Sequence, residues 1–253
     1  MPDDMSIESY LAQGGVLTNP SNVPSRYRAE LMKLMATFVD SELAGAAGFA
    51  DVINAGPGIK ERIAAAKIVL EKTDNADRVL TIMGEFGVNT KRYATHHPWA
   101  ARLDRSADIG ATRNEHDMRL AVFNYPLEGW TDAVVMNLIM GCAVGVQLAE
   151  FSSVSYQPLA EAFRAIAPVE ARHAELAEEG VARLAEDGDT AAIQASVNYW
   201  WPRVAVSFGG DDPARLKDLQ ALGLRRTGNA ELRDRWIAAA SAILDKYGLE
   251  VPR

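Results

Sequence analysis

The sequence is poor in cysteine and in long apolar runs, and each shortage excludes a class of protein. Cys142 is the single cysteine among 253 residues, so an internal disulfide framework is excluded, as is typical of a reducing cytoplasm. The most apolar stretch, 133–146, is interrupted by Asn137, Gly141 and Gly145, and it is shorter than a bilayer span. We therefore expect a cytoplasmic protein without a membrane segment, in which this stretch forms a buried core helix.

The chain also lacks an excess of positive charge. Its 26 lysines and arginines are outnumbered by 34 aspartates and glutamates, which argues against non-specific binding of nucleic acid. With 48% hydrophobic residues the chain is rich enough in apolar side chains for one large core. No apolar run of signal-peptide length follows the acidic start. We expect a lead-in over 1–24, a single domain over 25–253 and no nucleic-acid partner.

A strand pattern is missing as well, whereas helical spacing recurs along the chain. The fold class is therefore predicted to be all-α. Pro168 should kink the fourth long helix, and Thr131 or a neighbour should cap the third. The predicted helices cover 24–50, 59–86, 129–149, 159–185, 190–201, 213–222 and 229–247, with a loop-rich connection over 87–122. The spacing predicts that one side of the second helix carries Ile63, Ala66, Lys67, Leu70, Asp74, Asp77 and Leu80.

The stretch 170–173 reads Glu-Ala-Arg-His inside one of these helical patterns. Residues three apart share a helix face, so Glu170 and His173 point the same way. A carboxylate and an imidazole at this spacing are half of a di-iron carboxylate site, which forms inside a four-helix bundle. On this motif alone, a charged and solvated helix face remains the alternative.

Spacing connects this pair with other carboxylates. Glu42 lies on or beside the apolar stripe of the first long helix, where an uncompensated charge is costly, and it precedes Glu71 by 29 positions. Two antiparallel helices joined by a short loop would place Glu42 and Glu71 at similar heights. If the second half repeats the first, the site comprises Glu42, Glu71, Asp74, residue 141, Glu170 and His173. Aspartate can bind iron through oxygen, but residue 141 is glycine and has no side-chain ligand.

Further motifs, in matching order and spacing, make the chain resemble the catalytic subunit of the multicomponent phenylacetyl-CoA epoxidase, a ferritin-like protein also called phenylacetyl-CoA monooxygenase. The resemblance covers about 25–252, and the motifs are specific to the family only when taken together. They are Ser41-Glu42, Ala66-Lys67 followed by Glu71, Phe123-Asn124-Tyr125-Pro126, Trp130-x-Asp132, Ser155-Tyr156-x-Pro158, Glu170-x-x-His173, Trp200-Trp201-Pro202, Phe208-Gly209, Asp211-Asp212 and Asn229-x-Glu231-Leu232-Arg233.

The resemblance implies a ferritin-like four-helix bundle with additional C-terminal helices, in a bacterial cytosolic protein of aerobic phenylacetate breakdown. In that family a di-iron centre and O₂ epoxidise the ring of an acyl-CoA thioester. The resemblance implies iron ligands at Glu42, Glu71, Asp74, Glu170 and His173, with Glu71 and Glu170 as catalytic carboxylates. It also implies a homodimer, or a heteromer with a related helical protein, and a separate reductase that alone uses NADPH.

Three departures from the family pattern leave a second hypothesis open. The family has histidine where Asp74 stands and a carboxylate where Gly141 stands, and its catalytic subunit extends several dozen residues beyond the position of Arg253. The iron site is therefore complete, altered or absent, and in the last case Lys67, Arg172 or Arg78 would neutralise the carboxylates. The alternative function is a non-catalytic ferritin-like scaffold or acyl-CoA-binding subunit.

The remaining chemistry-bearing residues are given simpler roles. We interpret the adjacent His96 and His97, beside a proline, as solvated side chains and not as metal ligands. Cys142 is interpreted as a small buried hydrophobe, and Phe123 and the tryptophan pair 200–201 as core packing. The arginine pair 225–226 fits a solvated face or a subunit contact, with CoA phosphates as the alternative.

Overall fold

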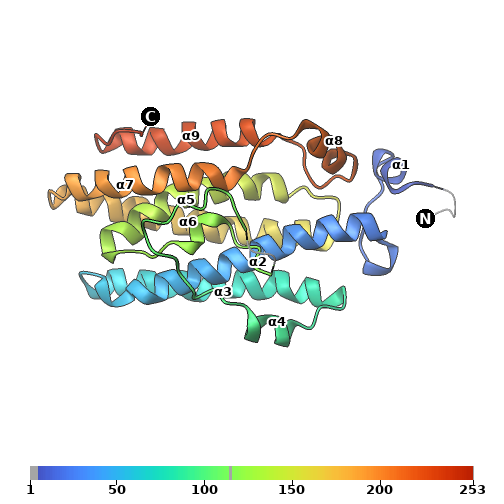
Figure 1. Ribbon diagram of the computed structural model, residues 1–253, viewed down its shortest axis with the longest axis horizontal. Coiled ribbons are helices and arrows are strands. Elements are labelled where there is room, and N and C mark those ends of the chain that lie inside the picture. The colour runs from blue at the N-terminus through green and yellow to red at the C-terminus, as the bar shows by residue number, and fades with distance from the viewer. Residues whose placement is uncertain (1–4, 114–115, 253) are drawn as a thin grey trace.

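The computed structural model describes residues 5–113 and 116–252, and in these ranges the chain is helical without a β-sheet (Figure 1). The all-α prediction is therefore confirmed. The α-helices are α1 (Ile7–Ala12), α2 (Ser25–Val52), α3 (Ile59–Glu85), α4 (Thr90–His96), α5 (Gly129–Phe151), α6 (Gln157–Glu186), α7 (Thr190–Ala205), α8 (Pro213–Ala221) and α9 (Asn229–Lys246).

Two long helical hairpins form the core of the fold. In one, α2 packs along α3, and in the other α5 packs along α6; α3 and α6 then bring the hairpins together. The C-terminal helices α7 and α9 cover the outer side of α5 (Figure 1). This arrangement is the expected ferritin-like four-helix bundle with additional C-terminal helices. The division into a lead-in over 1–24 and one domain over 25–253 stays a prediction.

The central position of α5 explains its composition. By length and hydropathy this helix could cross a membrane, but 61% of its most apolar window is buried inside the protein. Its neighbours α6, α7 and α9 cover most of its surface, so apolar residues are needed nearly all round. The expected core helix over this stretch is confirmed.

Asp132 fixes the start of α5 to the surrounding chain, where a cap by Thr131 or a neighbour was predicted. The Asp132 carboxylate accepts hydrogen bonds from the backbone N–H of Glu128 at 2.9 Å and from the indole of Trp200 at 2.7 Å. The Arg105 guanidinium donates to both of its oxygens, at 2.7 and 3.0 Å. Burial alone would raise the pKa of Asp132, but these donors outweigh it and hold the pKa below the usual range.

Candidate functional site

Four of the five predicted ligands gather in the middle of the bundle. Glu42 comes from α2, Glu71 from α3, and Glu170 and His173 from one turn of α6. The Nε2 atom of His173 lies 2.8 Å from Glu71 Oε2, and its Nδ1 atom lies 3.2 Å from Glu170 Oε1. The two carboxylates therefore contact opposite edges of one imidazole ring. This ring separates Glu71 from Glu170, so the two do not face a common point with His173.

A lysine that the motif analysis did not single out lies between the other two carboxylates. The Lys72 ammonium is 3.3 Å from Glu42 Oε1 and 2.9 Å from Glu170 Oε2. All three side chains are buried, with at most 7% of each exposed. The Asn75 amide donates a further hydrogen bond to Glu170 Oε1 at 3.0 Å. The centre of the bundle thus holds an ion network that neutralises its own carboxylates.

The two carboxyl groups beside Lys72 differ in pKa because they differ in partners. Burial and the charge of Glu170 raise the pKa of Glu42 to about 8, although Lys72 opposes the shift. For Glu170, burial would raise the pKa, but Lys72 and His173 outweigh it and hold the pKa well below the usual range. Burial would lower the pKa of Lys72, yet the two carboxylates raise it. Near neutral pH one lysine cation therefore faces one carboxylate and one protonated carboxyl.

Asp74 does not reach this site. Its side chain is exposed, while Lys72 and Asn75 point into the bundle from the same turn of α3. The residues assigned to one side of α3 do share a side, but it is the exposed one for all except Leu80, with Ile63 and Leu70 62% and 61% exposed. Since α3 carries apolar residues on two sides, periodicity alone does not determine which side is buried. The buried residues are Ala65, Ile68, Lys72, Asn75, Ala76, Val79, Leu80, Ile82 and Met83.

Of the three cations proposed as neutralising partners, only Lys67 contacts a carboxylate of the site, and it does so at the surface. Lys67 forms the expected surface pair with Glu71 at 3.5 Å, but its side chain is 56% exposed. Arg172 points outward and pairs with Glu175 at 2.9 Å, and Arg78 is exposed. A signal for Lys72 exists in the sequence, because it lies on the apolar spacing set by Ala65, Ile68, Ala76 and Val79.

Gly141 of α5 packs closely against Ala174 of α6. A Cβ at this position would lie 3.0 Å from the Cβ of Ala174 and 3.3 Å from its Cα. The adjacent cavity, bounded in part by Gly141, Lys72 and Glu170, has a volume of about 30 Å³, which suits a water molecule. With Lys72 between two of the carboxylates, Asp74 outside and no ligand at 141, the residues present do not fit a di-iron centre.

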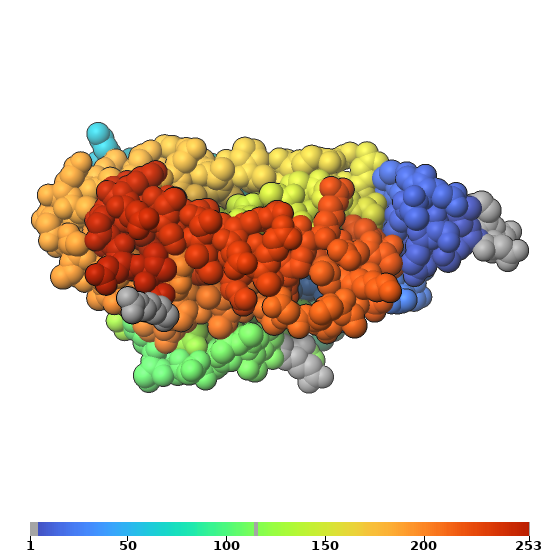
Figure 2. Space-filling view, turned by 90° about the horizontal axis from the view of Figure 1, so that it is seen from above, coloured from blue at the N-terminus to red at the C-terminus, as the bar shows by residue number. Residues whose placement is uncertain are grey.

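A larger cavity opens beside this network. It has a volume of about 600 Å³ and extends from the buried Glu42 to exposed residues of α2 and α8. Figure 2 shows a hollow on this face, between orange and red parts of the C-terminal chain, with blue atoms of the N-terminal part behind it. Apolar side chains line much of the cavity, among them Leu34, Phe38, Met140, Leu148 and Phe151, and its basic side chains are Lys33, Arg113, Arg215 and Arg225.

Two side chains that line this cavity, Glu42 and Arg225, have polar groups available to a ligand. The Oε2 atom of Glu42 is buried and has no hydrogen-bond partner among the described residues. Arg225 donates to the neutral Gln147 and Asn229, at 2.8 and 3.2 Å, and within the described residues no carboxylate lies within ion-pair distance of it. Burial lowers the pKa of Arg225. The arginine pair 225–226 is thus divided, because Arg226 is exposed whereas Arg225 lines the cavity.

Comparison with known proteins identifies the family of the chain. The model of a family described as phenylacetic acid catabolic protein matches residues 11–253. The chain belongs to this family. A relative, one of the subunits of 1,2-phenylacetyl-CoA epoxidase from Escherichia coli (strain K12), is 23% identical over 257 residues. The match covers all of this chain and 78% of the relative. The resemblance inferred from the motifs is therefore confirmed at the level of the family.

Proposed function

We propose that this chain is a non-catalytic, acyl-CoA-binding subunit of a phenylacetyl-CoA epoxidase-type assembly, in which an ion network replaces the di-iron centre. The observation that carries the proposal is the Lys72 ammonium between Glu42 and Glu170. Two iron ions would have to displace this cation and find ligands that Asp74 and Gly141 do not supply. The alternative inferred from the sequence is thus the better supported, and the expected epoxidation is assigned to a partner.

The physical argument rests on charge. A di-iron site needs several ionised carboxylates with open lone pairs, because the ions supply the compensating positive charge. Here Lys72 supplies that charge from within the chain, and Glu170 already accepts from both Lys72 and Asn75. A buried ammonium is stable only beside its counter-ions. The position of Lys72 between two carboxylates is therefore consistent with a site that holds no metal.

The 600 Å³ cavity supports the ligand part of the proposal. Its apolar lining suits an aromatic acyl group, and Glu42, whose Oε2 atom has no partner among the described residues, can donate a hydrogen bond to a carbonyl oxygen when protonated. Arg225 and Arg113 suit the phosphates of CoA, since guanidinium groups bind phosphate through paired donors, whereas Lys33 and Arg215 already pair with Glu30. The acyl-CoA would therefore lie with its acyl end toward Glu42 and its nucleotide toward Arg225.

The assembly part follows from the kind of relative matched, which is one subunit of an epoxidase. We propose a heteromer with a related helical subunit that carries the oxygenase chemistry, with a homodimer as the alternative. A separate reductase would draw electrons from NADPH for that partner and not for this chain. The proposal places the assembly in the cytoplasm, without a nucleic-acid or membrane partner.

Iron analysis tests the proposal directly. The chain and its Glu71→Gln variant are purified without chelator, loaded anaerobically with ferrous iron, desalted and analysed for iron per chain. We expect the two proteins to hold the same amount, because no iron depends on Glu71. About two irons per chain that disappear in Glu71→Gln would overturn the proposal and restore the di-iron oxygenase. One iron that disappears in Glu71→Gln would overturn it in favour of an altered mononuclear site.

A further inference from the structure

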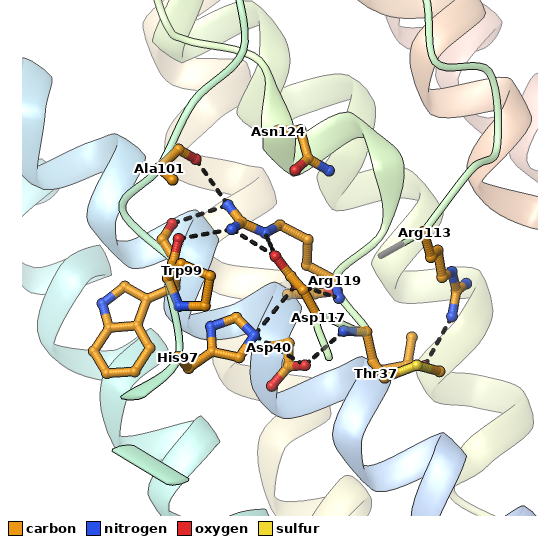
Figure 3. A network of polar contacts seen from close by, with 12 residues as sticks. Thr37, Asp40, His97, Trp99, Ala101, Arg113, Asp117, Arg119 and Asn124 are labelled. Atoms are coloured by element: carbon orange, nitrogen blue, oxygen red, sulfur yellow. Dashed lines mark hydrogen bonds and ion pairs between the residues drawn. The ribbon is translucent and has the colours of Figure 1, made fainter. Parts of the chain in front are cut away.

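A second buried cluster lies on the other side of α2 from the lysine network. Asp40 belongs to α2, His97 follows the end of α4, and Asp117 belongs to the long connection before α5. His97 Nε2 is 3.1 Å from Asp40 Oδ2 and 3.2 Å from Asp117 Oδ1 (Figure 3). Their side chains are 1–5% exposed. The expectation that His97 is solvated was therefore wrong, whereas His96 is exposed as predicted.

The His97 ring is held firmly, yet its polar edge is unsatisfied. Tyr93 and Trp99 stack on the ring at interplanar angles of 13° and 11°. Neither ring nitrogen makes a well-formed hydrogen bond within the described residues. Both carboxylate oxygens are close to Nε2 but lie off the direction of a ring N–H. A cation placed between this imidazole nitrogen and the two carboxylate oxygens could contact all three.

The two carboxylates are already oriented by other donors. Asp40 Oδ2 accepts from the backbone N–H of Met118 at 2.8 Å, and the Tyr93 hydroxyl donates to its Oδ1. Asp117 Oδ1 accepts from the backbone N–H of Arg119 at 3.1 Å, and the Arg119 side chain donates to its Oδ2 at 2.6 Å. Such outer partners are what hold the ligands of metal sites in place. Each of the two oxygens nearest His97 retains a lone pair for a cation.

We propose that Asp40, His97 and Asp117 form a binding site for one divalent transition-metal ion, of which Zn²⁺ is the best match. Imidazole nitrogen and carboxylate oxygen are both ligands that Zn²⁺ binds in proteins. The three ligand atoms lie within 4.8 Å of one another, so small side-chain shifts would bring all of them to bonding distance. Within the described residues, the two carboxylates outnumber the one guanidinium, Arg119, that contacts either of them, which favours a cation.

The ion would fasten the connection between α4 and α5 to α2. This connection already contacts α2 through the Leu120 backbone N–H, which donates to Ser41 Oγ at 3.0 Å. Ser41, Met118 and Leu120 all line the large cavity. Metal at Asp40 would therefore stabilise one wall of the proposed acyl-CoA site without taking part in oxygen chemistry.

Metal binding to matched histidine variants tests this site. The chelator-treated chain is titrated with Zn²⁺ by calorimetry and with Co²⁺ by visible absorption. We expect one ion per chain, and a loss of affinity above roughly 100-fold in His97→Gln, since loss of an outer partner alone costs up to about that factor. His96→Gln, which changes the exposed neighbour, should bind like the natural chain. His173→Gln should also bind normally, which would separate this site from the one around Glu71.

Crystals of the natural chain soaked in Zn²⁺ keep the test independent of variant folding. An anomalous peak between Asp40, His97 and Asp117 would confirm the proposal. No zinc bound to the folded chain would overturn it and would leave the cluster as a structural contact between His97 and two carboxylates. Zinc that is lost in His173→Gln but kept in His97→Gln would overturn it as well, and would at the same time contradict the metal-free network at Lys72.

Discussion

At the scale of single residues, Lys72 determines what the surrounding carboxylates can do. Glu42, Glu71, Glu170 and His173 are the residues that a di-iron site uses, and the sequence predicted their proximity from spacing and resemblance. The structure adds one buried ammonium 2.9 Å from Glu170. Because this ammonium already contacts Glu42 and Glu170, the residues form an ion network, which we propose replaces a metal centre.

Replacing Lys72 with methionine should destabilise the chain. Lys72→Met keeps most of the side-chain volume but removes the cation, which leaves the buried Glu170 carboxylate without its main partner. We expect a loss of about 3 kcal/mol in the free energy of unfolding, since Glu42 can stay protonated and limit the cost. Chemical denaturation followed by circular dichroism measures it.

Lys67→Met is the matched control, because Lys67 is 56% exposed and pairs with Glu71 at the surface. Surface pairs contribute little, so a change within about 0.5 kcal/mol is expected there. Equal effects of the two substitutions would contradict a central role for Lys72.

At the scale of helices, the close approach of α5 to α6 explains why position 141 is glycine. A side chain there would press on the backbone of Ala174, so a carboxylate at this position would require the two helices to separate. Gly145, one turn later on the same helix, is exposed and has no heavy atom within 4 Å of an added Cβ. The difference between the two glycines therefore lies in what packs against each of them in the folded chain.

This difference predicts opposite effects of the same substitution. Gly145→Ala should stabilise the chain by up to about 1 kcal/mol, because alanine is the better helix former. Gly141→Ala gains the same propensity but crowds Ala174, and overpacking costs about 1–3 kcal/mol, so the net effect should be destabilising. Thermal unfolding of both variants measures the difference. Stabilisation of similar size in both would show that α5 and α6 do not pack tightly at Gly141.

At the scale of the whole molecule, the large cavity depends on segments far apart in the sequence. α2, α5 and the chain from about 207 to 229 each supply part of its lining. Arg225 lies in this lining, whereas Arg226 beside it is exposed. Ligand binding should therefore distinguish two neighbouring arginines that look alike in the sequence.

Binding of phenylacetyl-CoA to arginine variants measures this distinction. Arg225→Gln should weaken binding by roughly tenfold, equivalent to about 1.4 kcal/mol, through the loss of a charge-assisted contact. Arg226→Gln should change the affinity little. Calorimetry on both variants gives the values, with free CoA as a second ligand to separate the nucleotide contribution. An equal loss in both variants would show that the arginines act only through net charge.

The sequence by itself determined the fold class, the order of the long helices and the family. These properties depend on hydrophobic periodicity, breakers such as the glycines near position 57, and motifs that stay recognisable as a set. It also identified four of the residues that meet in the bundle, because i, i+3 spacing and antiparallel hairpins are local geometry. The family comparison confirms that these signals belong together.

Only the tertiary structure decided which face of α3 is buried, and with it the nature of the site. The internal repeat and the family pattern placed Asp74 in the site, although it lies on the exposed side of α3, and the buried Lys72 was overlooked. His97, beside a proline, was likewise predicted to be solvated, but in the structure its buried ring lies against Asp40 and Asp117. In each case burial depends on which element packs against the residue, and periodicity in one helix carries no information about its partner.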